Sequence, residues 1–341
     1  TEAGRTLPAM ADTPRVTVVT PCYNSLRFLP ETVDAILGQT YRDFELVLVD
    51  DGGVDDLAGW VDGLGVDRVR LVRQVNSGAA AARNRGVAEG VGELVAFCDS
   101  DDLWTARTLE ALVLRYDDAQ AAAPPGREVG LVYGWYHIVR GDGTPTGHIG
   151  AYTADGDAWP QFVLHNPVGT SATLVPRAVF EEVGGFAVND ELIRVDVEDW
   201  DLWLRIADQH LVAVVPEVLY DYRRHDENTS SDVGGLDVAY RNLLRNTFEG
   251  QPPDRLALRP RAVAQVEIIL GWHSLNDERD PARALAYRRS ARRHHPGTMT
   301  WPDYWRLGAA ARAMALAGDS GFEAVRSGAQ GVRRRLGLRR S

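Results

Sequence analysis

The sequence predicts an α/β fold with a largely parallel sheet, and three features of residues 15–120 support this prediction. Short β-branched runs, which are typical of buried strands, alternate with segments of helical periodicity. Such alternation indicates a parallel sheet that helices cover on both faces. Polar side chains follow the carboxyl ends of several runs, where ligands bind in open α/β sheets.

The elements of this first part can be predicted in chain order. The β-branched run at residues 15–20 predicts a strand that ends at Pro21, and Pro30 suits the first turn of the helix that follows. The predicted strands are residues 15–20, 44–49, 69–72 and 94–98, and the predicted helices are residues 29–37, 79–87 and 103–116.

The pattern changes after a loop rich in proline, alanine and glycine at residues 121–126. Further strands are expected beyond it, together with a glycine turn, a tight turn and a helix that carries two tryptophans. The strands are expected at residues 129–139, within 167–175 and at 212–215, the turns at 141–143 and 183–186, and the helix at 199–207. From Leu236 the pattern is helical, with a break at residues 255–260.

These elements predict a disordered lead-in at residues 1–14, a domain at 15–235 and a helical region at 236–341. The domain divides into halves at 15–120 and 127–235. In the last part of the chain arginines outnumber acidic residues and interleave with Trp301 and Trp305. Two interpretations stay open for this basic tail, namely peripheral contact with an anionic membrane, or a solvated helix face followed by disorder.

Composition excludes several classes of protein. The 341 residues are 45% hydrophobic, which is enough for a sizeable core, and the net charge of −11 argues against nucleic-acid binding. Cys22 and Cys98 fall in predicted buried strands, so we expect small hydrophobic side chains and no disulfide framework. No run approaches the roughly 18–20 apolar residues of a membrane span, and residues 1–14 lack an apolar signal core. A cytoplasmic location is therefore expected.

The most informative segment follows the fourth predicted strand, where Asp99, Asp101 and Asp102 crowd together around Ser100. Crowded carboxylates repel one another, so such a cluster favours a bound cation. Mg²⁺ and Mn²⁺ prefer oxygen ligands and complete their shell with substrate phosphates. The alternative is a solvated acidic turn that caps the next helix.

Two other strand ends also carry polar groups. Asp51, followed by two glycines, could accept hydrogen bonds from a base or ribose, although a plain turn would use the same residues. Asn76 and Gly78 precede a helix that carries Arg83 and Arg85, which could reach a diphosphate. The alternative is an ordinary helix start with solvent-facing arginines.

Later in the chain, four carboxylates lie in residues 196–201 near a predicted helix start. The helix dipole partly explains them. Partial desolvation beside Val197 and Trp200 would also raise the pKa of one carboxyl toward that of a general base. His225 follows a strand and is a candidate for a phosphate or metal contact, or else an unremarkable surface histidine.

Taken together, these motifs resemble the family 2 inverting glycosyltransferases of the GT-A fold. The resemblance covers residues 15–232, and the order and spacing of the motifs carry it. The matching segments are residues 18–24, 39–41, 44–52, 76–78, 82–86, 92–93, 97–102, 184–186, 198–199 and 222–225. The family usually has a serine where this chain has Gly53.

The resemblance implies a mixed, Rossmann-like sheet flanked by helices, and a role for each matching residue. Pro21 and Tyr23 would line the base pocket, Asp51 would bind the base, and Arg83 would lie near the base or diphosphate. The nucleotide-sugar side would also include Asn24, Asn76, Gly78, Ser100 and Asp99, the last near the ribose.

The remaining implied roles concern the cation and the acceptor. Asp101 and His225 would bind Mn²⁺ or Mg²⁺, with Asp102 helping through water. Asp199 would be the catalytic base, and Glu198, Gly185 and Trp200 would form the acceptor side.

The implied activity is inverting transfer of a hexosyl group from a UDP, GDP or dTDP sugar to an acceptor hydroxyl. The acceptor would be a saccharide, a lipid-linked molecule or a small molecule in bacterial polysaccharide, glycolipid or glycoconjugate biosynthesis. One alternative is a non-catalytic nucleotide-sugar-binding protein. Another is a sugar nucleotidyltransferase, which would usually carry a glycine-rich loop where this chain has residues 22–27.

Overall fold

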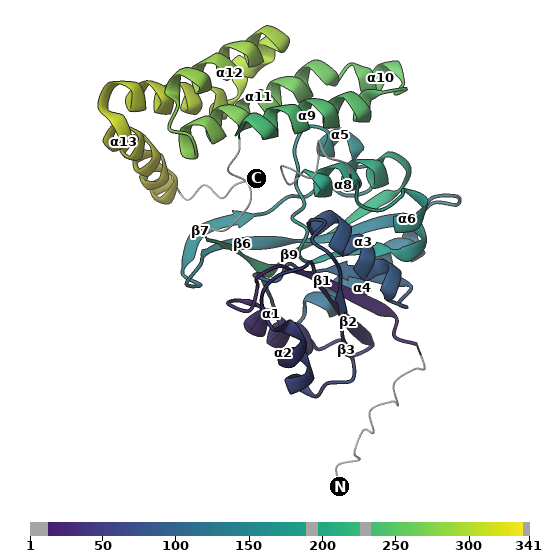
Figure 1. The fold of residues 1–341 in the computed structure, drawn as a ribbon. Helices are drawn as coiled ribbons and strands as arrows, with labels where there is room; N and C mark the ends of the chain where they lie inside the picture. Colours follow the sequence, from purple (N-terminus) through teal and green to yellow (C-terminus); the bar gives the residue numbers. More distant parts are fainter. Residues whose placement is uncertain (1–12, 189–196, 226–232, 337–341) are drawn as a thin grey trace. The chain divides into compact units, whose positions relative to one another are not determined.

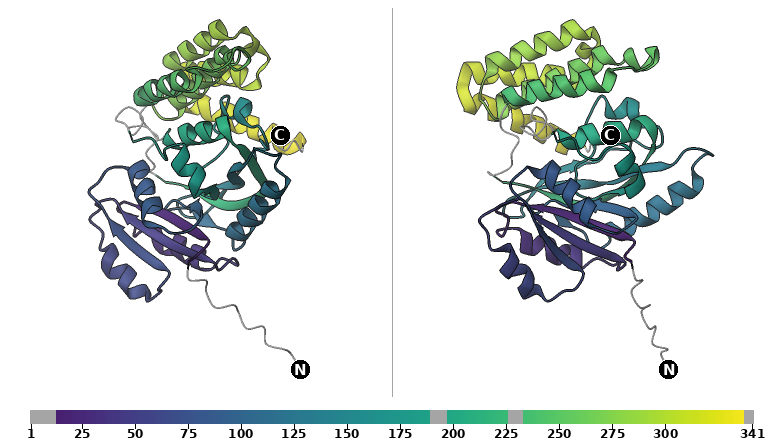
Figure 2. Two further views of the ribbon diagram at one scale, coloured as in Figure 1. Left: turned by 90° about the vertical axis from the view of Figure 1, so that its right-hand side faces the viewer. Right: turned by 45° about the vertical axis from the view of Figure 1, so that its right-hand side comes forward.

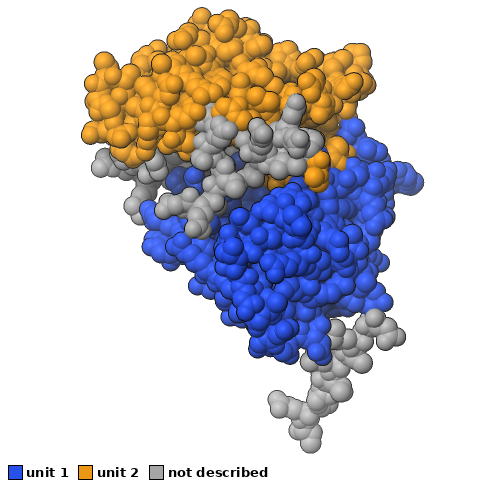
Figure 3. All heavy atoms as spheres, in the orientation of Figure 1, with its two compact units in different colours: residues 1–157, 168–187, 206–225 blue, residues 158–167, 188–205, 226–341 orange. Residues whose placement is uncertain are grey.

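The computed structural model describes residues 13–188, 197–225 and 233–336, which form two compact units (Figure 3). Unit 1 comprises residues 1–157, 168–187 and 206–225, and unit 2 comprises residues 158–167, 188–205 and 226–341. Nearly all of the expected lead-in, at residues 1–12, lies outside the described residues, as do Asp196 and the end of the basic tail at residues 337–341.

Unit 1 is built on a nine-stranded mixed sheet with the order β3-β2-β1-β4-β8-β6-β9-β5, and β7 pairs with β6 (Figure 1). Its strands are β1 (Val16–Cys22), β2 (Phe44–Asp50), β3 (Val69–Arg73), β4 (Leu94–Phe97), β5 (Leu103–Trp104), β6 (Val129–Arg140), β7 (Pro145–Gly150), β8 (Thr173–Pro176) and β9 (Leu211–Arg224).

The first four strands are parallel, so their carboxyl ends meet at one edge of the sheet. The connections between them contain α1 (Leu29–Leu37), α2 (Leu57–Leu64) and α3 (Ala79–Glu89). Next to β4, strand β8 runs antiparallel, which makes the sheet mixed. The predicted α/β class and mixed sheet are therefore confirmed.

The predicted end of the first strand at Pro21 is wrong. Strand β1 pairs with β2 through Pro21 and Cys22, while its pairing with β4 stops at Val19. Beyond Val19 the strand has a partner on one side only, so a proline without an N–H can be accommodated there.

The predicted helix start at Leu103 is also wrong. Leu103 and Trp104 form the short strand β5, which pairs with β9, and the helix α4 (Thr108–Ala122) begins later. The acidic cluster at residues 99–102 therefore leads into a strand, and the alternative that it caps a helix is excluded.

Helix α3 packs closely on the parallel strands because of a glycine. A Cβ atom on Gly86 would lie 2.3 Å from Val19 Cγ1 and 3.2 Å from Val49 Cγ2. Ala82, Val47 and Val49 form a small buried cluster at the same contact. Gly86 therefore permits the close approach of α3 to β1 and β2.

In the second half of unit 1 the strand predicted at 129–139 is confirmed as β6, whereas the one at 212–215 extends into the longer β9. The tight turn expected at 183–186 is present, with φ of +84° at Gly184 and +67° at Gly185. It follows a short helix that the sequence did not predict, α6 (Arg177–Glu182).

Unit 2 is helical, as predicted for the chain beyond Leu236. Its helices are α5 (Trp159–Phe162), the start of α8 (Glu198–Gln209), α9 (Val233–Phe248), α10 (Pro253–Leu256), α11 (Arg259–Asn276), α12 (Pro281–His294), the 3₁₀ helix η1 (Pro296–Thr300) and α13 (Pro302–Leu336) (Figure 2). The break predicted at 255–260 is narrower than expected, since α10 and α11 occupy part of it. Gly318, at φ +61°, kinks α13.

The core of the C-terminal helices is made of small and large apolar side chains in close contact. A Cβ atom on Gly271 of α11 would lie 2.6 Å from Leu307 of α13, so the glycine permits the approach of these two helices. Ile268, Leu275 and Tyr304 are buried in the same cluster. Among the described residues, no helix is long and apolar enough to cross a membrane.

Candidate active site

The carboxyl edge of the parallel strands carries the nucleotide-side residues predicted from the sequence, all in unit 1. Asn24 follows β1, Asp51 follows β2, Asn76 follows β3, and Asp99 follows β4. The sheet topology brings these four loops to one edge, because parallel strands present the same end on the same side.

Asp51 is 4% exposed and holds the loop between β3 and α3. Its Oδ1 accepts hydrogen bonds from Ser77 N–H at 2.8 Å and Gln74 Nε2 at 2.7 Å, and its Oδ2 accepts one from Gly78 N–H at 2.8 Å. These donors compensate the buried carboxylate. Asp51 thus positions the segment that begins α3.

The loop after β1 packs against the loop after β2. Asn24, at φ +50°, accepts a hydrogen bond from Val54 N–H at 2.8 Å. A Cβ atom on Gly53 would lie 2.9 Å from both the backbone nitrogen and Oδ1 of Asn24, so glycine fits this contact. Next to it, Tyr23 is 55% exposed and Pro21 is half-buried.

Arg83 and Asp99 form an ion pair whose nitrogen–oxygen distance is 2.6 Å. The Arg83 side chain is 7% exposed, and it extends from α3 toward the end of β4. Arg85 instead pairs with Glu89 along the helix surface at 2.6 Å, so the solvent-facing alternative holds for that residue. Ser100 accepts a hydrogen bond at its carbonyl from Thr32.

Asp102 is fully buried and bonded to two neighbouring segments. It accepts hydrogen bonds from the Ser171 hydroxyl at 2.5 Å and from the Arg223 N–H at 2.9 Å. Burial and the negative charges of Asp101 and Asp99 raise the pKa of Asp102 well above its ordinary value. Ser171 also accepts a hydrogen bond from Asp99 N–H, so this network ties β4 to β8 and β9.

Asp101 and His225 lie side by side, with 2.8 Å between Asp101 Oδ2 and His225 Nε2. Burial and the charge of Asp99 raise the pKa of Asp101, while the hydrogen bond with His225 opposes that rise. The His225 ring lies 4.8 Å from that of Phe28. A divalent cation at this position would relieve the repulsion among the carboxylates.

Asp199, Glu198 and Trp200 occupy the first turn of α8, in unit 2, whereas Gly185 lies in the turn after α6, in unit 1. Asn166 Nδ2 lies 3.3 Å from both carboxylate oxygens of Asp199, and Asp199 Oδ1 accepts the Trp200 N–H at 2.5 Å. Glu198 is 6% exposed. Trp200 is 1% exposed and donates its indole N–H to Phe162, so its ring packs inside unit 2.

Comparison with known proteins identifies the family. Residues 17–182 match the family model described as glycosyl transferase family 2. Residues 17–182 therefore belong to this family. Its fold resembles that of a crystal structure of S. aureus TarS, residues 1–349, with a TM-score of 0.60 at 15% identity over 96% of this chain and 93% of that one. At this identity the likeness establishes the GT-A fold alone.

Family 2 relatives are found in several bacteria. An uncharacterized glycosyltransferase of Rickettsia bellii is 26% identical over 63% of this chain and 30% of its own length. YwdF of Bacillus subtilis, also an uncharacterized glycosyltransferase, is 28% identical over 67% of this chain and 82% of its own. TuaG of the same organism, named for teichuronic acid biosynthesis, is 27% identical over 64% and 82%. The chain thus spans about a third of the length of the Rickettsia relative.

Some residues of this family 2 site were not singled out from the sequence. Asn84 bonds the backbone of Phe186 through both its amide nitrogen and oxygen, which joins α3 to the turn that contains Gly185. Ser171 and Asn166 contact predicted site residues from distant segments. Asn84 lies inside a motif of the resemblance, whereas Ser171 and Asn166 carry no local signal that would distinguish them.

Proposed function

We propose that this chain is a nucleotide-sugar-dependent, inverting glycosyltransferase. The observation that carries the proposal is the convergence of Asp51, Asp99, Asp101 and His225 at one sheet edge in a family 2 chain. These features suit a nucleoside diphosphate and its cation. Asp51 positions the loop that begins α3, Arg83 lies beside it, and Asp101 and His225 form a carboxylate–imidazole pair.

UDP is the donor nucleotide that we favour among UDP, GDP and dTDP. TarS, whose fold resembles this one, has been solved in complex with UDP-GlcNAc. The ring of Tyr23 is accessible to a base, and aromatic rings stack well on bases. We assign Pro21 and Asn24 to the same base-side loop, and Asn76, Gly78 and Ser100 to the nucleotide-sugar side. The Gly78 N–H is already bonded to Asp51, so Gly78 would act through the backbone shape of the loop.

The cation would be held by Asp101 and His225. A carboxylate oxygen and an imidazole nitrogen 2.8 Å apart form a mixed donor set, which suits Mn²⁺ better than Mg²⁺ because Mg²⁺ prefers oxygen ligands. When bound, the cation would neutralise charge on the departing diphosphate. Asp102, which is buried and bonded to Ser171 and Arg223, would hold the cluster in place.

Asp199 is our candidate for the general base. Its carboxylate would remove the proton from the acceptor hydroxyl, and the oxygen would attack the anomeric carbon from the face opposite the nucleotide, which inverts the configuration. Asn166, at 3.3 Å from both carboxylate oxygens, orients the base. Glu198 and the turn at Gly185 would shape the acceptor side, with Trp200 supporting Glu198 and Asp199 from within unit 2.

The acceptor is proposed at the level of a class. The name of TuaG favours a polysaccharide pathway, with a saccharide or lipid-linked acceptor. The cytoplasmic location and the peripheral membrane contact of the basic tail stay predictions, and the side chains of that tail from Arg326 onward lie outside the described residues.

The first test replaces Asp199 with Asn in a sugar-transfer assay with UDP-sugars and Mn²⁺. We expect transfer to fall by about 10²–10⁴-fold, the usual contribution of a general base, while UDP binding is retained. Asp101→Asn should instead weaken Mn²⁺-dependent UDP binding. Asp118 is an exposed carboxylate of α4, and Asp118→Asn is the matched control. It should change neither sugar transfer nor Mn²⁺-dependent UDP binding.

The same experiment separates the alternatives. Full transfer by Asp199→Asn would contradict the assignment of the base. Nucleotide-sugar binding without transfer by the unaltered chain, across a panel of saccharide acceptors, would support a non-catalytic binder. Diphosphate release from a nucleoside triphosphate and a sugar phosphate would support a nucleotidyltransferase.

A further inference from the structure

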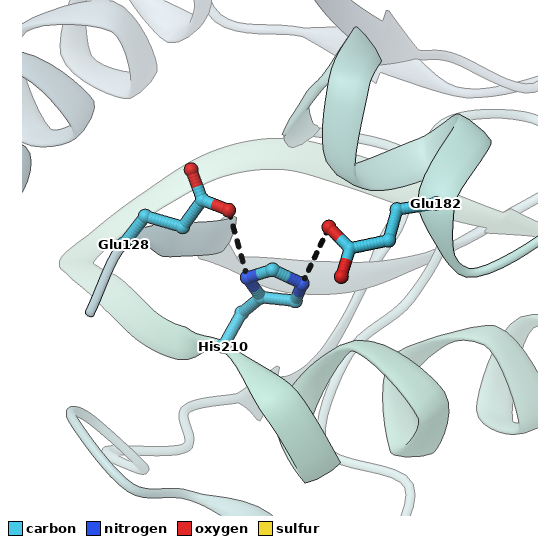
Figure 4. Close-up of side chains that lie close together, drawn as sticks. All are labelled: Glu128, Glu182 and His210. Atoms are coloured by element: carbon cyan, nitrogen blue, oxygen red, sulfur yellow. Dashed lines mark ion pairs between the residues drawn. The ribbon is translucent and has the colours of Figure 1, made fainter. Parts of the chain in front are cut away.

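A second cluster of metal-ligating side chains lies in unit 1, away from the sheet edge described above. Glu128 precedes β6, Glu182 ends α6, and His210 precedes β9 (Figure 4). His225 follows the other end of β9, which is 14 residues long, so on the order of 40 Å of strand separates the two histidines. The cluster is therefore distinct from the Asp101–His225 pair.

The backbone holds this cluster together. The N–H of Leu211 donates to the carbonyl of Glu128 at 2.9 Å, and the N–H of His210 donates to Ile206 at 2.8 Å. A Cβ atom on Gly130 would lie 2.6 Å from His210 Cβ, so the glycine leaves the space that the histidine occupies. Three chain segments thus converge on one imidazole.

The imidazole of His210 is buried, and its hydrogen-bonding capacity is incompletely used. Its side chain is 6% exposed, with Nδ1 3.4 Å from Glu128 Oε1 and Nε2 3.5 Å from Glu182 Oε2. Charge-assisted hydrogen bonds between such groups are normally about 2.7–2.9 Å long. Among the described residues, the buried Nε2 has no hydrogen-bond partner.

The surroundings leave room for a ligand. The cluster opens into a cavity of about 470 Å³ lined by Gly126, Arg127, Glu128, Glu182, Gln209 and His210. Both glutamate side chains are 52% exposed and can therefore change rotamer. Within the described parts of the chain, neither carboxylate forms an ion pair with an arginine, so each is available to a cation.

We propose that Glu128, Glu182 and His210 bind a divalent transition-metal ion of the Zn²⁺ type. One ligand atom from each residue lies within 4.8 Å of the other two. Zn²⁺ binds imidazole nitrogen and carboxylate oxygen at about 2.0–2.2 Å, and tetrahedral geometry then separates two ligands by about 3.4 Å. The observed 3.5 Å between His210 Nε2 and Glu182 Oε2 fits that spacing, whereas Glu128 faces Nδ1 at 3.4 Å (Figure 4) and would turn its exposed side chain toward the ion at Nε2.

The ion would join the starts of β6 and β9 to the end of α6. Water from the cavity would supply the fourth ligand, and binding energy would add to the stability of unit 1, because the unfolded chain does not preform the site. Because the cluster lies away from the residues proposed for sugar transfer, the effect of the ion should appear in stability before it appears in turnover.

The test uses Co²⁺ as a visible probe and Zn²⁺ as its competitor, with the full chain carrying Asp101→Asn to remove the other candidate metal site. We expect a Co²⁺ absorption band that Zn²⁺ abolishes, and a rise in melting temperature with Zn²⁺. Glu182→Gln and His210→Gln should each weaken binding at least 10-fold. Glu181→Gln, the exposed neighbour in α6, is the matched control and should bind as tightly as its parent.

Two outcomes would overturn the proposal. One is equal Co²⁺ affinity for Glu182→Gln and its parent, since Glu182 is half exposed and its substitution does not threaten folding. The other is the absence of metal binding at millimolar Co²⁺ or Zn²⁺, with a melting temperature that does not respond to metal. The second result would leave His210 as an ion-pairing residue only.

Discussion

At the scale of single residues, the acidic side chains after β2 and β4 differ in how their charge is compensated. Asp51 accepts hydrogen bonds from three N–H donors, and the Asp99 carboxylate pairs with Arg83. Asp102 is buried with fewer donors and close to other carboxylates, so its pKa is raised. The cluster therefore combines charges that the protein neutralises with charges that a cation would stabilise.

The two cysteines provide a prediction at this scale. Burial raises the pKa of Cys22 to about 12 and that of Cys98 well above its ordinary value, so both thiols stay protonated at neutral pH. An exposed thiol titrates near pH 8.5, and its reaction rate therefore rises between pH 7 and pH 9. We expect no reaction of the native chain with a thiol-specific disulfide reagent in this range, and two equivalents after unfolding.

Glutathione in the same buffers is the control for the reagent. A native-state rate that increases with pH in step with that of glutathione would mean that one of the cysteines is accessible and ionises normally. No reaction in the native state would also support the sequence-based prediction that both cysteines are small buried hydrophobic side chains. Both side chains are buried in the structure.

At the scale of elements, the turn after α6 is defined by two glycines with different surroundings. Both have positive φ, but a Cβ atom on Gly184 would meet nothing within 4 Å. On Gly185 it would lie 2.8 Å from Asn84 Oδ1 and 3.0 Å from the Phe180 ring. Position 185 therefore requires glycine for two reasons, its positive φ and the lack of space for a Cβ atom.

This difference predicts unequal effects of alanine. Gly184→Ala should lower the free energy of unfolding by about 1 kcal/mol, the penalty of a left-handed alanine. Gly185→Ala should lower the free energy of unfolding by at least about 1 kcal/mol more, because the side chain of Asn84, which bonds the backbone of Phe186, must move. Urea unfolding of both variants measures this, and equal losses would show that the contact with Asn84 is unimportant.

Local sequence patterns predicted the existence of strands and helices more accurately than they predicted the residues at which those elements begin and end. β-branched runs identified the parallel strands, because β1, β2 and β4 are buried and largely apolar, although β3 is only partly buried. The start of α4 and the continuation of β1 through Pro21 depended on pairing with β9 and β2, and such partners lie far along the chain. For the same reason Ser171 could not be linked to Asp102 from the sequence.

At the scale of the whole molecule, long-range aromatic contacts determine which segments group together. Trp159 lies 5.7 Å from Phe248, and Trp200 lies 5.6 Å from Tyr240, between ring centroids. These contacts join α5 and the start of α8 to α9 within unit 2. The sequence indicated where the helical pattern begins, but not that the segment with Asp199 packs with those helices, because no local pattern encodes the aromatic partners.

This division into units leads to a thermal prediction for the complete chain. The residues of the proposed nucleotide and cation site, Asp51, Arg83, Asp99, Asp101 and His225, all belong to unit 1. A ligand that binds only the folded state, at 100 times its dissociation constant, stabilises it by about 2.7 kcal/mol. For a unit of this size that corresponds to a rise of roughly 5–10 °C in melting temperature.

Differential scanning calorimetry with UDP, GDP or dTDP, each with and without Mn²⁺, measures the effect. We expect a Mn²⁺-dependent rise with one nucleotide, absent in Asp101→Asn, together with slower hydrogen exchange at residues 51 and 76–83. If the units melt separately, only the transition of unit 1 should move. A rise that persists in Asp101→Asn would contradict the proposed cation site, because the nucleotide would then bind without the carboxylate that we assign to its metal.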